Sequence, residues 1–393
     1  MLTSIIRIAK NERRQEKILN NFLSDTVRIF DDPTVSEEKI VELIIQLANS
    51  GEKLNFNSRV FDFASTGGPS SLSTILVPLY LYAHGENVIN LAIPGRPAGA
   101  VDVLSQIPYY QLNNIQTSKL EKKHFYLHLE ADEKFVPLDK KLFDYRKKVN
   151  KIDVPNLAIA SLLAKKLASG ASNIGLDVRV SSFGNFGKNW EECVQNAKKY
   201  NRIANALGIE STCFLSDANA PYQPYIGRGE ALVALHNIIN NACGNRLNKH
   251  NYLCVEIVKS LLHVDFAFSS EVLKRAFLEN LILQNSDYHY FESKVEEILA
   301  QPYRLLCAPV DGFVYYNLLE IRNYLVCRQS LDERITKYPD PSGMTLLQEQ
   351  GSYIEKGQPV LRIRNPLPCL EDKYSFFNIE RNESIPEHES EVI

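Results

Sequence analysis

The chain has 393 residues, of which 45% are hydrophobic and 23% charged, and its formal net charge is −3. This balance is typical of a globular protein with two or three domains, and the small net charge argues against nucleic acid or an anionic membrane as a main partner. No apolar window reaches the roughly 18 residues of a membrane-spanning helix, and the first residues lack the apolar core of a signal peptide. We therefore expect a cytoplasmic protein.

The seven cysteines are odd in number and include no C-x-x-C pair. This favours free thiols in a reducing compartment over disulfides or zinc. His124 and His128 are four residues apart but lie in an expected strand, so we do not interpret them as metal ligands. We predict no metal and no cofactor.

The chain begins with helical patterns and then changes to strands alternating with helices. The predicted strands cover 60–64, 88–93, 176–180 and 212–215. The predicted helices among them cover 155–169, 189–207 and 230–241. Strands separated by helix-length connections favour an α/β fold with a mainly parallel sheet covered by helices. Ligands of such sheets bind at the carboxyl ends of the strands, where the loops begin at Ser65, Arg96, Ser181 and Asp217.

The strand at 60–64 runs directly into Ser65-Thr66-Gly67-Gly68, and an apolar helix is expected from about Ser71 to Ala83. Glycines let the backbone approach a ligand closely, and the free N–H groups of a helix start favour negative charge. By itself such a turn is more often an ordinary strand-to-helix connection. It indicates an anion site only together with other features.

The C-terminal third is helical over 251–300 and then β-rich. Segments 308–314 and 351–361 resemble the turn-strand repeats of biotinyl/lipoyl-type barrel-sandwich hairpins, without the sequence context of a modified lysine. The tail is polar, acidic and aperiodic, which is typical of disorder. We predict a small helical domain at 1–57 joined in space by helices of about 138–170, a larger α/β domain at 58–137 and 171–300, a barrel-sandwich-like α+β module at 301–370, and a disordered tail at 371–393.

Six short segments match, in order and spacing, the motifs of one enzyme family. The family patterns D-K-H-S-T-G-G, I-S-G-R-G, L-D-K-L-E-x-I-P-G, S-I-L-x-K-K-L, M-D-V-K-V-G-S-G and L-L-T-D-M-N-Q-P correspond to 62–68, 93–97, 101–109, 161–167, 176–183 and 214–221. Over about residues 1–366 the chain thus resembles the thymidine/pyrimidine-nucleoside phosphorylases and, more distantly, anthranilate phosphoribosyltransferase.

The resemblance implies a pentosyltransferase that cleaves or forms the N-glycosidic bond of a pyrimidine-like nucleoside or nucleotide. It also implies a homodimer, with phosphate as co-substrate. By motif matching Arg146, Ser161 and Lys165 would bind the base. Ser161 and Lys165 are four residues apart and share a helix face. Arg146 and Lys165 would act catalytically by stabilising the charge that grows on the departing base.

We predict the phosphate or acceptor site at Ser65, Gly67, Gly68, Ser73 and Arg96. The resemblance implies the two serines, with Thr74 or Ser71 as alternatives to Ser73, and the glycine N–H groups and Arg96 would add to them. Asp217 and Asn219 lie on a strand-end loop and could contact a sugar or a cation, with an Asx turn as the alternative.

The acceptor motifs also depart from the family. Phe63, Ala64 and Pro94 stand where the family has lysine, histidine and serine. We expect Phe63 and Ala64 to make the pocket more apolar. These departures keep two alternatives open: a nucleoside-binding homologue that has lost catalysis, or a changed enzyme that uses water or pyrophosphate.

Overall fold

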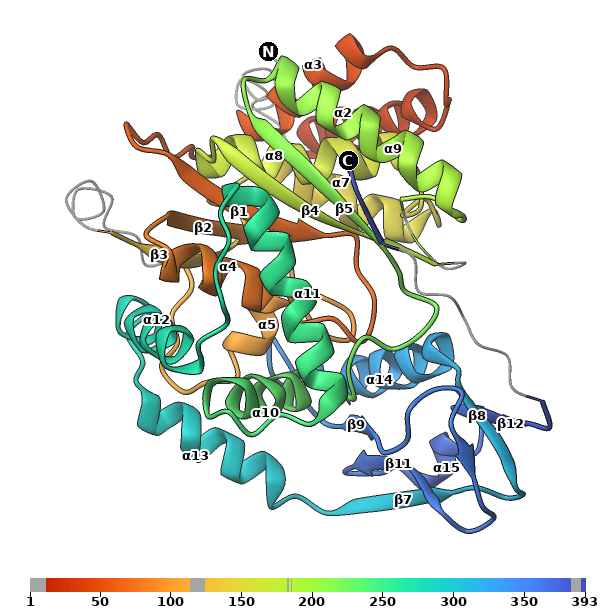
Figure 1. Cartoon of the computed structure of the whole chain (residues 1–393). Helices are drawn as coiled ribbons and strands as arrows, with labels where there is room; N and C mark the ends of the chain where they lie inside the picture. The colour runs from red at the N-terminus through yellow and green to blue at the C-terminus, as the bar shows by residue number, and fades with distance from the viewer. Residues whose placement is uncertain (1–11, 114–123, 182–183, 185, 383–389) are drawn as a thin grey trace.

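A six-stranded sheet forms the centre of the protein in the computed structural model, which describes residues 12–113, 124–181, 184, 186–382 and 390–393 (Figure 1). The strand order is β13-β5-β4-β1-β2-β3. Five strands run parallel, namely β1 (Val60–Ser65), β2 (Asn87–Ala92), β3 (Tyr126–Glu130), β4 (Asn173–Val180) and β5 (Glu210–Asp217). The predicted α/β fold with a mainly parallel sheet is confirmed.

Helices cover both faces of this sheet. On one face lie α4 (Ser73–Ala83), α11 (Asn245–Leu262) and α12 (Ser270–Leu283), with α5 (Ala100–Leu104), α10 (Arg228–Ile239) and α13 (Tyr288–Leu299) beyond them. On the other face lie α8 (Pro155–Ser169) and α9 (Trp190–Ala206). The N-terminal helices α2 (Glu12–Phe30) and α3 (Glu37–Ala48) pack with α7 (Pro137–Lys148) and α8.

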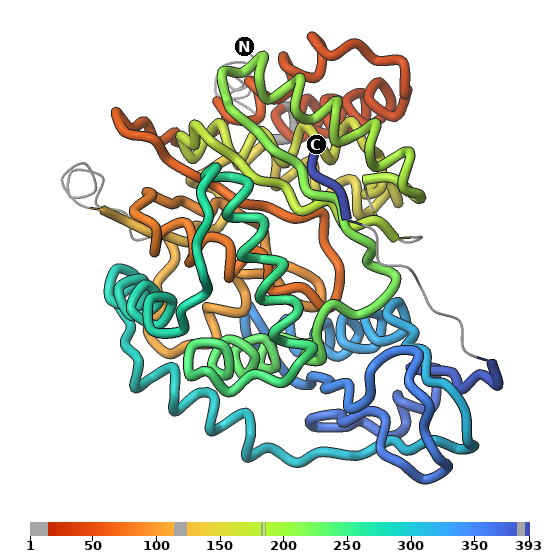
Figure 2. Tube along the Cα trace, in the orientation of Figure 1, coloured from red at the N-terminus to blue at the C-terminus, as the bar shows by residue number. Residues whose placement is uncertain are grey.

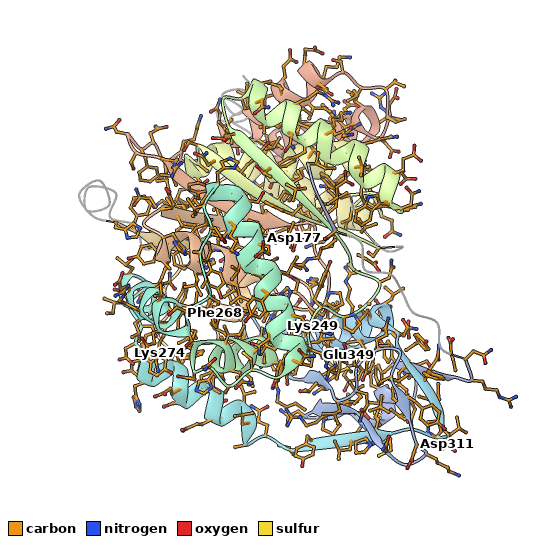
Figure 3. The ribbon with its side chains drawn as sticks, in the orientation of Figure 1. Asp177, Lys249, Phe268, Lys274, Asp311 and Glu349 are labelled. Atoms are coloured by element: carbon orange, nitrogen blue, oxygen red, sulfur yellow. The ribbon has the colours of Figure 1, made fainter. Side chains whose placement is uncertain are left out.

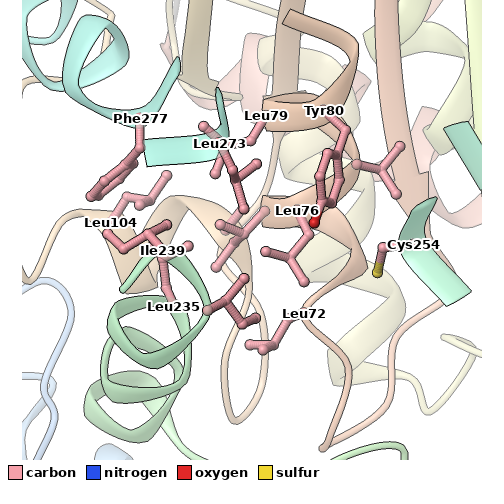
Figure 4. Packing of buried hydrophobic residues seen from close by; sticks show 14 of the residues in the cluster. Leu72, Leu76, Leu79, Tyr80, Leu104, Leu235, Ile239, Cys254, Leu273 and Phe277 are labelled. Carbon is pink, nitrogen blue, oxygen red and sulfur yellow. The ribbon is translucent and has the colours of Figure 1, made fainter. Parts of the chain in front are cut away.

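Helix α4 is apolar on almost every side because it lies between the sheet and other helices. Leu76 of α4 packs in one cluster with Leu235 of α10 and Leu273 of α12 (Figure 4). A helix without a polar face is covered on all sides by other elements. This packing fixes the position of α4, and with it the end of the glycine turn that leads into the helix.

The C-terminal module is β-rich, as predicted. It contains β7 (Tyr303–Cys307), β8 (Gly312–Tyr316), α14 (Leu318–Asp332), β9 (Gly343–Leu346), β10 (Tyr353–Ile354), β11 (Pro359–Arg364), α15 (Pro368–Glu371) and β12 (Phe377–Glu380). These strands form two sheets of order β10-β8-β12 and β6-β9-β11-β7, where β6 is Tyr225–Ile226. Ion pairs join the module to the rest of the chain. Arg364 lies 2.8 Å from Glu230 of α10. Lys249 of α11 lies 3.0 Å from Glu349, and Figure 3 labels both residues.

The prediction of a disordered tail at 371–393 is wrong for residues 371–382 and 390–393, and its remaining part, 383–389, lies outside the described residues. Strand β12 pairs with β8 of the module, and β13 (Ser390–Val392) pairs antiparallel with β5 of the central sheet. Ile393 and Cys213 exchange two backbone hydrogen bonds of 2.8 and 2.9 Å. Figure 2 shows the C-terminus lying beside the strands of the central sheet. Backbone hydrogen bonds to β8 and β5 hold these two strands. Such strands do not require alternating apolar side chains, so neither the pattern nor the composition of the tail indicated them.

None of the helices in the described ranges is long and apolar enough to cross a membrane.

Candidate active site

The glycine turn links the carboxyl end of β1 to the start of α4. Gly67 and Gly68 have φ angles of 97° and 140°, which side-chain-bearing residues rarely adopt. The Gly67 N–H donates to Ser65 Oγ at 3.3 Å. The strand register places Ser65 beside Asp177 of β4. The structure therefore brings Ser65, Gly67 and Gly68 together at the mouth of the sheet, as predicted.

Ser73 belongs to the same corner, but its hydroxyl is engaged by the protein. It donates to Asp177 Oδ2 at 2.5 Å. Arg179 completes a buried cluster: its Nε donates to Asp177 Oδ2 at 3.0 Å, its Nη2 to Ser73 Oγ at 3.1 Å, and its Nη1 to the Gly68 carbonyl at 3.1 Å. Asp177, which Figure 3 labels, thus ties the start of α4 to β4.

Sequence reasoning quoted Arg179 only as part of a motif and did not identify it as a site residue. A signal was available, because residues two apart on a strand point to the same face. Asp177 and Arg179 are two residues apart in β4. The sequence therefore indicated that the two side chains lie on the same face of the strand, next to each other.

The start of α4 offers fewer free N–H groups than expected. The Leu72 N–H donates to His250 Nε2 at 2.8 Å, and the Ser73 N–H donates to Ser71 Oγ at 3.1 Å. Burial lowers the pKa of His250 to about 3, so this imidazole is neutral. Because Nε2 accepts, the proton lies on Nδ1, which is buried and has no partner in the described part of the chain.

Arg96 follows β2 and pairs with Glu333, directly after α14, at 2.8 Å, and both side chains are 42% exposed. Its contact with an acceptor stays a prediction. The expectation that Phe63 lines the pocket is corrected. Phe63 is fully buried, and its ring lies across Gly175, where an added Cβ would be 2.5 Å from Phe63 Cδ2. The ring faces the core because side chains alternate along β1, so it does not line the mouth.

The predicted base-binding residues Ser161 and Lys165 share one face of α8, as expected. Lys165 Nζ donates to Ser161 Oγ at 2.8 Å and to Asp139 Oδ2 of α7 at 2.7 Å, and Ser161 Oγ donates to the same oxygen at 3.0 Å. All three side chains are buried, and Asp139 Oδ1 has no partner among the described residues. Sequence reasoning missed Asp139, because an acidic residue in the first turn of a helix is common for reasons of helix polarity alone.

Arg146 lies on α7 and is also buried. Its Nε donates to the Lys151 carbonyl at 3.0 Å, and its terminal nitrogens donate to the carbonyls of Leu157 and Ile152. Burial lowers the pKa of Arg146 to about 10, against the opposing effect of Asp139 and Asp153. Arg146 is therefore cationic at neutral pH and shares the negative charge of Asp139 with Lys165.

A second buried pair anchors α8 to the sheet. Lys166 Nζ lies 2.7 Å from Asp62 Oδ1 of β1, and both side chains are buried. Burial lowers the pKa of Lys166 and raises that of Asp62. Neighbouring lysines of α8 thus have different partners: Lys165 faces α7 and Lys166 faces β1.

Asp217 and Asn219 form an Asx turn at the end of β5. The backbone N–H and the side-chain amide of Asn219 donate to Asp217 Oδ1 at 2.9 and 2.8 Å. The turn confirms the alternative stated from the sequence, and the sugar contact stays a prediction. Residues 182 and 183 of the motif that follows β4 lie outside the described residues.

No family model matches the chain. A pyrimidine-nucleoside phosphorylase of Geobacillus stearothermophilus is 24% identical over 267 residues, 66% of this chain and 60% of that relative, so the match covers less than two thirds of the relative's length. A pyrimidine-nucleoside phosphorylase of Staphylococcus epidermidis is 24% identical over 368 residues, 86% of this chain and 82% of that relative.

Solved structures similar to the chain include anthranilate phosphoribosyltransferase from Thermus thermophilus, with a TM-score of 0.45 and 13% identity over 75% of this chain and 98% of that one. The enzyme of the same name from Saccharomyces cerevisiae gives a TM-score of 0.45 and 11% identity over 75% of this chain and 88% of that one. The sequence matches confirm that the chain resembles the pyrimidine-nucleoside phosphorylases.

Proposed function

We propose that the protein is a pentosyltransferase that breaks or forms the N-glycosidic bond between a pyrimidine-like base and a pentose, with phosphate or another oxyanion as acceptor. Its relatives are named as pyrimidine-nucleoside phosphorylases. The observation that carries the proposal is the convergence of Ser161 and Lys165 on Asp139, on the helix pair that also holds Arg146.

The proposed chemistry follows from the charges of this cluster. As the glycosidic bond breaks, negative charge grows on the base, and cationic donors aimed at that charge lower the barrier. Arg146 and Lys165 supply such donors. Their present partners are backbone carbonyls, Asp139 and Ser161, so base binding requires the Lys165 ammonium to exchange at least part of its contact with Asp139 for a carbonyl of the base.

The direct test incubates the protein with uridine, thymidine and their monophosphates, with and without phosphate, and measures free base. Release only with phosphate supports phosphorolysis, and release without it indicates hydrolysis. Lys165→Ala should abolish release, whereas Lys147→Ala, which removes an exposed lysine of α7 paired with Asp144, should not. Unchanged turnover in Lys165→Ala would contradict the base-site assignment.

A nucleoside-binding protein without catalysis is the second candidate. It is favoured by two observations: Arg96 already has a carboxylate partner in Glu333, and position 63, where the family has a lysine, is a buried phenylalanine. Ligand-dependent melting shifts without base release under any condition would support it. The homodimer implied by the family resemblance stays a prediction.

A further inference from the structure

At the acceptor corner the lysine of the family is absent and the predicted Arg96 has a carboxylate partner, but the corner contains another cation, Arg179. Position 63 is a buried phenylalanine, and Arg96 pairs with Glu333. The guanidinium of Arg179 instead lies against the glycine turn, with Nη1 3.1 Å from the Gly68 carbonyl and Nη2 3.1 Å from Ser73 Oγ. A Cβ added to Gly68 would be 3.2 Å from both Cδ and Nη1 of Arg179.

Arg179 has unused donor capacity. A guanidinium has five N–H groups, and its contacts with Asp177, Gly68 and Ser73 use three of them. One N–H therefore remains on each terminal nitrogen without a partner among the described residues. The side chain is only 3% exposed, and leaving charged donors unpaired in a buried place is unfavourable.

Two further donors lie at the same turn. The Gly68 N–H has no partner in the described part of the chain. Ser65 Oγ accepts from the Gly67 N–H, so its own O–H remains available to donate. Ser65 and Gly68 are half-buried and Gly67 is exposed, which leaves this side of the turn open to solvent.

We propose that Arg179, the Gly68 N–H and the Ser65 hydroxyl bind a phosphate oxyanion at the glycine turn. Paired N–H groups of arginine match the oxygens of phosphate, and glycine allows the backbone to approach it. Asp177 and Ser73 position Arg179 and do not contact the anion. The assignment rests on the proposed function only for the anion's role as acceptor; the binding itself does not require catalysis.

The test measures binding of inorganic phosphate to the purified full chain by calorimetry. Arg179→Gln should weaken binding about 10- to 100-fold, the range of a charge-assisted hydrogen bond. Arg179→Lys should weaken it less, because it keeps the charge and loses the paired N–H groups. Ser65→Ala should weaken it about 2- to 10-fold, as expected for a neutral hydrogen bond.

Arg364→Gln is the matched control, because Arg364, in β11 of the C-terminal module, is a buried arginine with two carboxylate partners, Glu230 and Asp340. It should lower the melting temperature and leave phosphate affinity unchanged. Equal losses of affinity in Arg179→Gln and Arg364→Gln would overturn the proposal, as would wild-type affinity in a folded Arg179→Gln. If Arg179→Gln does not fold, unchanged affinity in both Arg179→Lys and Ser65→Ala overturns it.

A parallel titration with uridine 5′-monophosphate distinguishes free phosphate from the phosphoryl group of a nucleotide. If Arg179→Gln loses affinity for either ligand, the site is supported, and the ligand affected shows whether the bound anion is free phosphate or the phosphoryl group of a nucleotide. If the wild type binds neither ligand, the proposal is overturned. Phosphate-dependent base release that is unaffected by Arg179→Gln would overturn this inference alone. Phosphate binding that requires Arg179, without any base release, would overturn the proposed function alone.

Discussion

The base side, around Asp139, and the glycine turn, around Asp177, differ in how many N–H donors of their cations have partners within the protein. On the base side, Lys165 and Ser161 both turn toward Asp139, and Arg146 donates to three backbone carbonyls. At the glycine turn, Asp177 holds Arg179 while the guanidinium keeps N–H groups free beside exposed backbone. The turn is therefore preformed for its anion, whereas the base side must exchange internal bonds when a ligand binds.

The largest expected effect comes from removing the aspartate of the base side. Asp139→Ala leaves the Lys165 ammonium buried with only Ser161 as partner, and loss of one member of a buried ion pair costs about 3–5 kcal/mol of stability. Asp177→Ala should lower the stability less, because Arg179 keeps its hydrogen bonds to the Gly68 carbonyl and to Ser73. Urea unfolding measures the loss of stability in both variants. Asp144→Ala, which breaks an exposed pair with Lys147, is the control and should cost about 0–1 kcal/mol. A larger loss in Asp177→Ala than in Asp139→Ala would reverse the comparison.

The sequence predicted the scaffold of both clusters better than their contacts. Strand and helix periods located β1, β4 and α8, and helical spacing placed Ser161 beside Lys165. Asp139 and Arg179 were missed because their roles depend on which elements become neighbours, which no local period encodes. Phe63 was misjudged because a motif match gives its position in the chain and not the face of β1 on which it lies. The tail was misjudged because backbone pairing to β5 and β8 is independent of side-chain pattern.

The glycine-turn side should respond to acid. Burial lowers the pKa of His250 to about 3, from an ordinary value of 6.5. Between these values the unfolded chain binds a proton that the folded chain does not, so stability falls as the pH decreases below about 6.5, by about 1.4 kcal/mol per pH unit. His250→Gln should remove this part of the slope in unfolding measured from pH 7 to 5. An unchanged slope would show that His250 is protonated in the folded protein.

On the base side, Arg146→Lys tests whether this side chain acts as a rigid clamp of the loop between α7 and α8. A lysine keeps the charge but cannot reach the carbonyls of Lys151, Ile152 and Leu157 with one planar group. The expected loss of stability is about 1.5–3 kcal/mol, the range of a hydrogen bond to a charged group. Urea unfolding measures it against Lys148→Arg, a change in the same helical turn. A loss no greater than in this control would mean that the three carbonyl contacts of Arg146 contribute little to stability.

The smallest effect is expected for the ion pair between Arg96 and Glu333. Arg96 and Glu333 are each 42% exposed, and exposed pairs contribute about 0–1 kcal/mol because water and salt screen them. Glu333→Gln should therefore change the free energy of unfolding by less than about 1 kcal/mol, and by less still at high salt. A larger, salt-resistant loss would show that the pair is a fixed joint between the sheet and the C-terminal module. In that case Arg96 would be committed to Glu333, and Arg179 would be the cation available to an anion at the turn.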